Sequence, residues 1–486
     1  MTPFRAKILS AGLWSGFDAG LRFGVQFAVS IVLARVLSPT DFGIFALTAV
    51  FIALSSVLVD GGFCSALVQR AEINRAEETA VFWYNGIAAV VLAGIIAGLA
   101  PVMARVFGHP VLEHLLYVSA IIVPINAMAA VPGSLMQRHL RFDTLAKSGL
   151  TASLLSGTLA VVLAMNGVGI WTFAWQALAH AVINVVLLWR LSGWRPQRDT
   201  SIGAARPLVR FGFFLSLSNL LEVAYQQGFA LVIGKLYGAR DLGYFNRGQN
   251  LQMLPANVLT LVITRVSLPV LSTKSDPAEL RRGVHLAQAV AMMGNLPLMG
   301  ALVIMPDLII DVLYGPKWLP AAPILRILAI GGILVPMNAV NLQLTLARGR
   351  SELYLKTEMV KKVIGILIVC LASIYGGVIG LAVSQVAFLC LSFAVNATVS
   401  GRFTGYSPLE QLWDLRGPAL LTLAMMALIG VVKPFLEFSS LVNVAILSAL
   451  GGVFFIGTAL LLRVGATDQF IALLPGRRAS TKKSTT

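Results

Sequence analysis

Seven ionisable side chains lie inside long apolar stretches of this 486-residue sequence, where a charge is costly and therefore indicates a function. They are Asp18, Arg22, Asp60, Glu222, Arg247, Arg265 and Arg326. A charge at the centre of a bilayer costs about 2.5–3.5 kcal/mol or more, so such groups usually face a cavity or an ion path. We expect the five residues Arg22, Glu222, Arg247, Arg265 and Arg326 to line a substrate cavity, and the carboxylates of Asp18, Asp60 and Glu222 to couple an ion.

The spacing of these residues leaves two interpretations open. Asp18 and Arg22 are four residues apart, so they share a helical face and can pair with each other. Arg22 also corresponds to Glu222 at an offset of 200 residues, which would allow a pair across a central cavity. The alternative is that each charge neutralises a neighbour within its own half of the chain.

Arg247 and Arg265 are 18 residues apart, which is five helical turns, so they fall on one face of a long helix. A basic column in a cavity would suit a phosphate or an acidic sugar, because guanidinium groups bind such oxygens in pairs. Arg265 could instead reach outward from the cytoplasmic end of the helix. Both interpretations remain open.

The sequence contains no set of residues typical of catalysis or of a metal site. The five histidines are scattered, and the three cysteines have no CxxC spacing. The longest outward connection, near residues 306–322, is too short for the external catalytic loop of a membrane enzyme. We therefore expect neither enzymatic activity nor a cofactor or bound metal.

The elements that carry these residues are predicted to be membrane-spanning helices. Hydrophobic residues make up 57% of the chain, charged residues only 12%, and the mean hydropathy is +0.83. About 20 apolar residues are needed for one crossing. Fourteen spans are expected, near 14–36, 43–67, 80–102, 114–134, 148–166, 169–190, 211–236, 242–271, 284–305, 323–347, 358–375, 378–400, 417–435 and 441–462.

The basic residues fix the predicted orientation of these spans. With the N-terminus inside, 27 Lys and Arg residues fall in cytoplasmic segments and six on the opposite side. Both ends of the chain are then cytoplasmic. This bias accounts for most of the net charge of +16, so no nucleic-acid partner is expected.

A duplication organises the spans into two halves. VLARVLSPTDFGIF at 32–45 matches VIGKLYGARDLGYF at 232–245, with Asp41, Gly43 and Phe45 recurring 200 residues later. The prediction is an all-α integral membrane protein with two pseudo-symmetric six-helix bundles and two further helices, the parallel-repeat plan of some transporters. The expected parts are a first bundle at 1–190, a basic linker at 191–210, a second bundle at 211–401, appended helices at 402–463 and a cytoplasmic tail at 464–486.

Several segments resemble a known family. LARVLSPTDFGIFAL, VDGGFCSALVQR at 59–70 and VFWYN at 81–85 resemble the Wzx-type polysaccharide flippases, and look closest to the branch of colanic-acid exporters. YFNRGQNLQMLP at 244–255 and LYGPKWLPAAPILRILAI at 313–330 extend the similarity into the second half. That family is similar to the lipid II flippases and to the multidrug and toxin extruders of the same superfamily.

The resemblance implies a function, a location and partners. The substrate would be an undecaprenyl-diphosphate-linked oligosaccharide, flipped across the bacterial inner membrane by alternating access for exopolysaccharide, capsule or O-antigen (lipopolysaccharide) biosynthesis. Membrane lipids, a polysaccharide polymerase and export machinery would be its partners. Phe229 stands where relatives often have an acidic residue, although Glu222 lies two turns earlier. The alternative is a cation-coupled drug or metabolite antiporter of the same superfamily.

Overall fold

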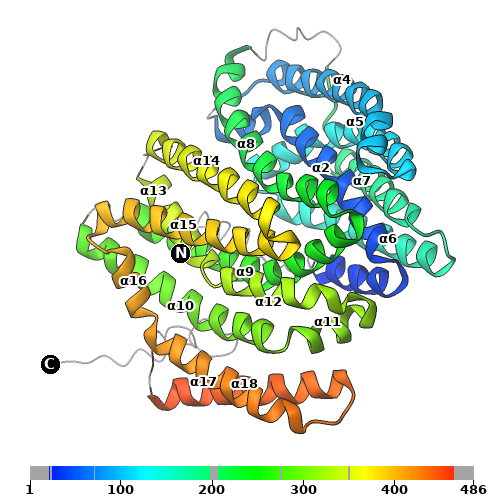
Figure 1. The fold of residues 1–486 in the computed structure, drawn as a ribbon. Helices are drawn as coiled ribbons and strands as arrows, with labels where there is room; N and C mark the ends of the chain where they lie inside the picture. Colours follow the sequence, from blue (N-terminus) through cyan, green and yellow to red (C-terminus); the bar gives the residue numbers. More distant parts are fainter. Residues whose placement is uncertain are drawn as a thin grey trace. The chain divides into compact units, whose positions relative to one another are not determined.

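The chain is helical throughout the part that the structure describes (Figure 1). The computed structural model describes residues 21, 24–70, 72–197, 206–273, 276–348, 351–462 and 464. Within these ranges, ten helices are long and apolar enough to cross a membrane. Helices of 31, 35 and 25 residues and the short apolar helix Gly24–Val36 occupy the other four predicted spans. The chain is therefore a multi-helix membrane protein, and the count of fourteen crossings stays a prediction.

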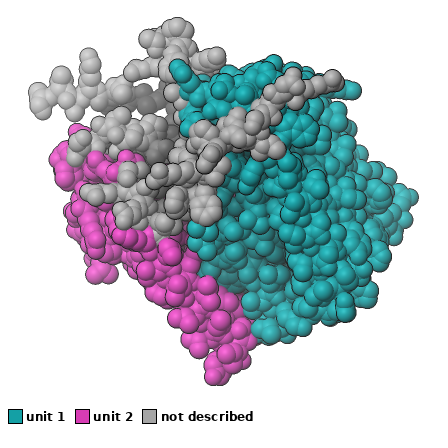
Figure 2. All heavy atoms as spheres, turned by 90° about the horizontal axis from the view of Figure 1, so that it is seen from above, with its two compact units in different colours: residues 1–246 teal, residues 247–486 magenta. Residues whose placement is uncertain are grey.

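Two compact units divide the chain, residues 1–246 (unit 1) and 247–486 (unit 2), coloured separately in Figure 2. Unit 1 contains α2 (Pro39–Asp60), α3 (Phe63–Gln69), α4 (Arg75–Phe107), α5 (Pro110–Arg138), α6 (Phe142–Met165), α7 (Trp171–Ser192) and α8 (Arg206–Leu236). Helix α9 (Ala239–Thr273) begins in unit 1 and continues in unit 2.

Unit 2 holds the remaining helices. They are α10 (Pro277–Ile304), α11 (Pro306–Tyr314), η2 (Pro316–Ala321), α12 (Ala322–Gly332), α13 (Val335–Ala347), α14 (Ser351–Tyr375), α15 (Gly377–Thr404), α16 (Pro408–Asp414), α17 (Arg416–Val432), η3 (Lys433–Phe435) and α18 (Ser440–Leu462). Helix α17 packs on α10 and α18, and a cluster including Met293, Met425 and Leu447 fills the space between them. The last two helices are thus part of the core of unit 2.

Polar caps set the ends of the apolar helices. Ser38 precedes α2, its hydroxyl accepts from the Asp41 backbone N–H at 3.2 Å, and its own N–H donates to the Asp41 carboxylate at 3.0 Å. Asn74 and Glu77 form the same reciprocal pair at the start of α4. Each of these reciprocal pairs is a capping box, which gives hydrogen-bond partners to backbone N–H groups that the start of a helix leaves unsatisfied. The helices therefore begin at these residues.

Two prolines remove backbone donors inside the units, and side chains from other helices satisfy the carbonyl groups left open. Pro132 has no N–H for the Met128 carbonyl, which instead accepts from the Trp189 indole of α7 at 2.8 Å. In unit 2, Pro336 leaves the Gly332 carbonyl open, and the Asn295 amide of α10 donates to it at 3.1 Å. Helix α5 continues through its prolines, whereas the predicted span 323–347 is divided into α12 and α13.

The segments of the sequence repeat meet within unit 1. The helices before them end at residues 36 and 236, and α2 and α9 begin at 39 and 239. A β-carbon on Gly43 would overlap the Ala239 carbonyl oxygen, and one on Gly243 would overlap that of Pro39. The two contacts are reciprocal under the 200-residue offset. Only glycine lets the two helix starts approach this closely.

Candidate functional site

A carboxylate and two glycines form the turn between α2 and α3. Asp60 ends α2, and Gly61 and Gly62 follow with φ of 53° and 72°, values that favour glycine. The Asp60 Oδ1 atom accepts from the Cys64 backbone N–H at 3.1 Å, in the first turn of α3. The turn therefore fixes the Asp60 carboxylate at the break between the two helices.

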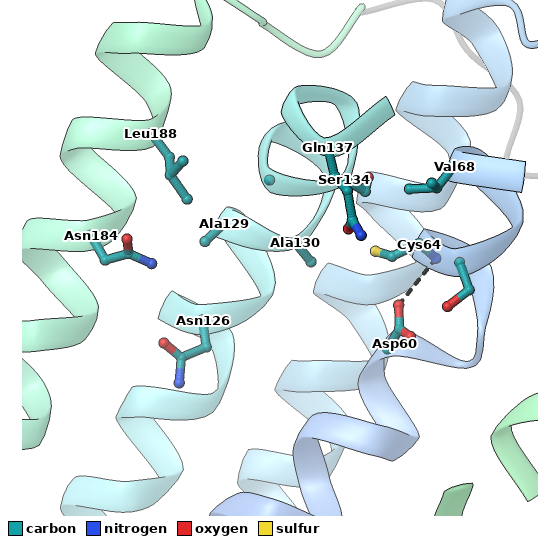
Figure 3. A pocket seen from close by; sticks show the side chains of 12 residues that line it. Asp60, Cys64, Val68, Asn126, Ala129, Ala130, Ser134, Gln137, Asn184 and Leu188 are labelled. Atoms are coloured by element: carbon teal, nitrogen blue, oxygen red, sulfur yellow. Dashed lines mark hydrogen bonds between the residues drawn. The ribbon is translucent and has the colours of Figure 1, made fainter. Parts of the chain in front are cut away.

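Asp60 lines a polar pocket of about 470 Å³ in unit 1 (Figure 3). Figure 3 shows α5 between the α2–α3 turn on one side and α7 on the other. The polar members of the lining are Asp60, Ser65, Asn126, Ser134, Gln137 and Asn184. The part contributed by α5 also includes Ala129, Ala130 and Gly133, so small residues leave the space open. A β-carbon on Gly133 would meet nothing within 4 Å.

Two further cavities adjoin this pocket through shared residues. One of about 140 Å³ is lined by both Asp60 and Asn126, and one of about 270 Å³ is lined by Asn126, Gln26, Gln176 and His180. Asn126 therefore belongs to all three. The three cavities thus share lining residues of α2 and α5, inside a unit whose helices are otherwise strongly apolar.

The cations next to the pocket are engaged with other groups. Arg138, which follows the lining residue Gln137, donates to the backbone carbonyls of Leu67 at 2.8 Å and Arg70 at 2.5 Å. Arg70 in turn pairs with Glu77 at 3.3 Å. The residues lining the three described cavities include no lysine or arginine. The site thus offers amides, hydroxyls, one imidazole and one carboxylate.

The predicted site residues are spread over the chain. Asp18 and Arg22 lie outside the described residues, as does the side chain of Arg265 in α9. Asp60 is the predicted residue that the structure places in the pocket. Glu222 lies on α8, where it accepts from the Gln226 amide at 2.7 Å.

The two remaining predicted arginines lie in unit 2. Arg247 is 9% exposed, and its guanidinium lies 5.9 Å from the ring centre of Tyr314. Arg326 donates to Asp307 at 3.4 Å and to the Val303 carbonyl at 3.2 Å. Neither residue lines a cavity described here, so their role in substrate binding stays a prediction.

A buried charged group in unit 2 was missed by the sequence analysis. Lys361, only 2% exposed, donates to Glu358 at 2.5 Å and to the Asn396 side chain at 2.9 Å. Asn396 donates in turn to Asn338 at 3.1 Å. Lys361 was counted among the 27 basic residues of the cytoplasmic segments, although it lies near the start of the predicted span 358–375. In the structure α14 begins at residue 351 and carries Lys361 into the packed unit. The i, i+3 spacing of Glu358 and Lys361 was the available signal.

The family model described as "Polysaccharide biosynthesis protein" matches residues 32–323, which is more than half of the chain. The chain belongs to this family. The resemblance to Wzx-type exporters inferred from the motifs is thereby confirmed.

Curated relatives are similar over most of their length. The chain is 25% identical to lipopolysaccharide biosynthesis protein WzxC of Escherichia coli over 386 residues, 77% of each chain. It is 27% identical to succinoglycan biosynthesis transport protein ExoT of Rhizobium meliloti, over 70% of this chain and 69% of the relative. Teichuronic acid biosynthesis protein TuaB of Bacillus subtilis is 26% identical over 366 residues.

Solved structures show the same fold at low sequence identity. The lipid II flippase MurJ in an inward closed conformation matches with a TM-score of 0.77 and 14% identity, covering 93% of this chain and 99% of its own. An inward-facing multidrug transporter of the MOP superfamily matches with a TM-score of 0.60 and 17% identity, over 79% and 96%. The family-specific segments therefore occur on the fold shared by these transporters.

Proposed function

We propose that this protein is a transporter that flips undecaprenyl-diphosphate-linked oligosaccharide repeat units across the bacterial inner membrane by alternating access. Its product would enter exopolysaccharide, capsule or O-antigen biosynthesis. The observation that carries the proposal is the family match over residues 32–323. The names of the relatives WzxC and ExoT, which refer to lipopolysaccharide biosynthesis and to succinoglycan transport, support the same class of cargo.

The polar pocket of unit 1 gives this proposal a physical basis. A sugar headgroup cannot cross the hydrocarbon core without partners for its hydroxyl groups, because each unsatisfied polar group is costly there. The amides of Asn126, Asn184 and Gln137 supply both donors and acceptors. The lipid tail would remain in the bilayer. Arg22, Glu222, Arg247, Arg265 and Arg326 remain proposed contacts to the diphosphate and the sugars.

In this proposal the chain performs no catalysis and needs no cofactor. It would work in the inner membrane with both termini in the cytoplasm, beside a polysaccharide polymerase and export machinery. Asp18, Asp60 and Glu222 are the proposed ion-coupling residues. Within the described residues, no cluster of three His, Cys, Asp or Glu side chains has the arrangement of a metal site.

Deletion of the gene tests the proposed function. We expect lipid-linked repeat units to accumulate on the cytoplasmic face and surface polysaccharide to be lost. Plasmid-borne wild type and the Gly94→Leu variant should each reverse both effects of the deletion, because a β-carbon at Gly94 meets nothing within 4 Å. The Gly133→Leu variant, whose new side chain fills the pocket, should reverse neither effect. Normal translocation of repeat units in the deletion strain would exclude this function.

A cation-coupled drug or metabolite antiporter is the second candidate. It is favoured by the likeness to the multidrug transporter and by a carboxylate, Asp60, at a membrane pocket. An antiporter would change the resistance of the deletion strain to cationic drugs and leave surface polysaccharide intact. Measuring both properties in the same strain separates the two functions.

A further inference from the structure

The pocket of unit 1 has a chemical bias that the proposed function does not require. A lipid-linked repeat unit can contain neutral, amino or acidic sugars, and a transporter could accept any of them. The pocket residues offer oxygen and amide groups of Asp60, Asn126, Gln137 and Asn184 but no lysine or arginine. A carboxylate or phosphate on a sugar would therefore find no positive partner among the described residues lining the pocket.

Asp60 adds a carboxylate to this lining. It lines two of the three cavities, and the Cys64 backbone N–H holds it in place. An ionised carboxylate accepts hydrogen bonds from hydroxyl groups and repels a second carboxylate. The arginine of α5, Arg138, donates to two backbone carbonyls at the end of α3 and is not among the residues that line the pocket. The pocket is thus suited to hydroxyl groups and unsuited to acids.

The size of the pocket agrees with a small ring. Its volume of about 470 Å³ lies within the range of about 300–1,000 Å³ that is usual for small-molecule sites. Ala129, Ala130 and Gly133 of α5 are small residues of the lining and leave room between the polar groups. The apolar face of a pyranose ring would lie over these small residues while its hydroxyl groups reach the flanking amides.

From this lining we infer that the unit 1 pocket binds a neutral sugar ring of the cargo and discriminates against uronic acids and other acidic sugars, with Asp60 as the discriminating residue. The inference rests on the proposed function for the identity of the cargo. It assigns the sugar-contacting role to Asp60, Asn126 and Asn184, and leaves the diphosphate to other parts of the protein.

A matched pair of soluble probes tests this inference on the purified full-length protein in lipid nanodiscs. Methyl β-glucoside and methyl β-glucuronide differ only in a hydroxymethyl group and a carboxylate. Saturation-transfer NMR at neutral pH measures their binding at millimolar concentrations. We expect the wild type to bind the glucoside at least tenfold better than the glucuronide.

Two variants identify the pocket and the residue. Asp60→Asn keeps an oxygen for the Cys64 N–H and removes the charge, so the glucoside-to-glucuronide ratio should fall at least fivefold. Gly133→Leu should abolish the glucoside signal, whereas Gly94→Leu should retain it. Asp143→Asn, at an exposed carboxylate on α6, should leave the ratio unchanged.

The outcomes separate this inference from the proposed function. Equal binding of both probes to the wild type, no glucoside binding, or a glucoside signal that survives Gly133→Leu would overturn the inference. An unchanged ratio in Asp60→Asn would do the same. None of these binding results depends on translocation, which the deletion strain tests separately. Repeat units that accumulate in the deletion strain, together with equal probe binding, would leave the flippase function standing without this selectivity.

Discussion

Lys361 shows what a buried charge does in this protein. Its ammonium contacts the Glu358 carboxylate and the Asn396 side-chain oxygen, and Lys362 approaches the same carboxylate at 3.2 Å. Replacing Lys361 would leave the Asn396 side-chain oxygen without this donor and the Glu358 carboxylate with Lys362 alone, and a buried polar group left unsatisfied costs about 1–3 kcal/mol. The group links α14 to Asn396 of α15, and Asn396 in turn links to Asn338 of α13.

Replacing Lys361 with methionine should lower the free energy of unfolding by about 1–3 kcal/mol, the cost of leaving a buried polar partner unsatisfied. Equilibrium unfolding of the purified protein in mixed micelles measures the change. Lys356→Met is the matched control, because Lys356 is exposed on the same helix. We expect the control to change stability by less than about 0.5 kcal/mol. Equal losses in both variants would contradict a special role for the buried ammonium.

Charge within apolar segments was enough to single out Asp60 from the sequence, but it could not find the residues around it. Asn126, Gln137 and Asn184 are uncharged, and amides occur in many helices without function. Their convergence depends on how α5 packs against α2 and α7, and this packing includes the bond between Trp189 and the Met128 carbonyl. Hydropathy contains no information about such a contact. The carboxylate was therefore predictable, and the pocket was not.

At the scale of elements, the reciprocal contact of α2 and α9 requires a glycine at two positions, and this requirement can be tested. Gly43 and Gly243 each face a backbone carbonyl that cannot move without moving its helix. An alanine at either position must push the two helix starts apart. We expect Gly43→Ala and Gly243→Ala each to weaken the contact, since the repeat makes them equivalent.

Labelling of a cysteine at position 239 measures this separation. Ala239 is only 2% exposed, so Ala239→Cys should react slowly with a maleimide in a background without the three native cysteines. Adding Gly43→Ala or Gly243→Ala should raise the labelling rate several-fold. Gly86→Ala is the control, because its β-carbon meets nothing within 4 Å. Unchanged labelling in both glycine variants would show that the contact tolerates a side chain.

Helix α16 gives a prediction about pH. Hydrogen bonds from the Ser407 backbone N–H and hydroxyl, followed by the Arg281 guanidinium at 3.0 Å, lower the pKa of Glu410 below its ordinary value of 4.5. A lowered carboxyl pKa contributes stability that is present above pH 4.5 and is lost as the pH falls through the folded-state pKa. Hydrogen exchange in α16, corrected for intrinsic rates, should therefore rise as the pH falls below 4.5. Glu410→Gln should remove this pH dependence, and an identical profile in the variant would refute the assignment.

Side-chain caps begin helices α2, α4, α10 and α16, and these polar residues lie outside the apolar runs that predicted the spans. The expected start at residue 80 moved to 75 in the structure, because Asn74 and Glu77 cap a polar first turn that hydropathy does not count. The division of the span 323–347 was harder to predict. Proline is compatible with a continuous helix, as Pro124 and Pro132 in α5 show, unless its neighbours stabilise a break. In α12 and α13, Asn295 provides that stabilisation through the Gly332 and Ile333 carbonyls.

At the scale of the molecule, the fold persists while residue identity falls to 14% against the lipid II flippase. A lipid-facing position accepts any apolar side chain, and residues such as Leu461, 83% exposed, are free to vary. Hydropathy therefore predicts the spans well. Hydropathy cannot predict which spans pack against each other, because an apolar helix such as α17 could pack on many others. That α17 packs on α10 depends on side chains such as Met425 and Met293, which share one buried cluster. The pairing had to come from the structure.

The orientation in the membrane is the last property that the charges predict. The bias of 27 basic residues to six places the loop at His139 in the cytoplasm and the loop at Asn166 outside. Both positions are exposed at helix ends, so single cysteines there are accessible. In cysteine-free protein in intact spheroplasts, Asn166→Cys should react with a membrane-impermeant maleimide, and His139→Cys should react only after lysis. The opposite labelling pattern would mean that the topology is inverted. The starts of α2 and α9, which the predicted orientation places outside, would then be the ends that a cytoplasmic substrate meets first.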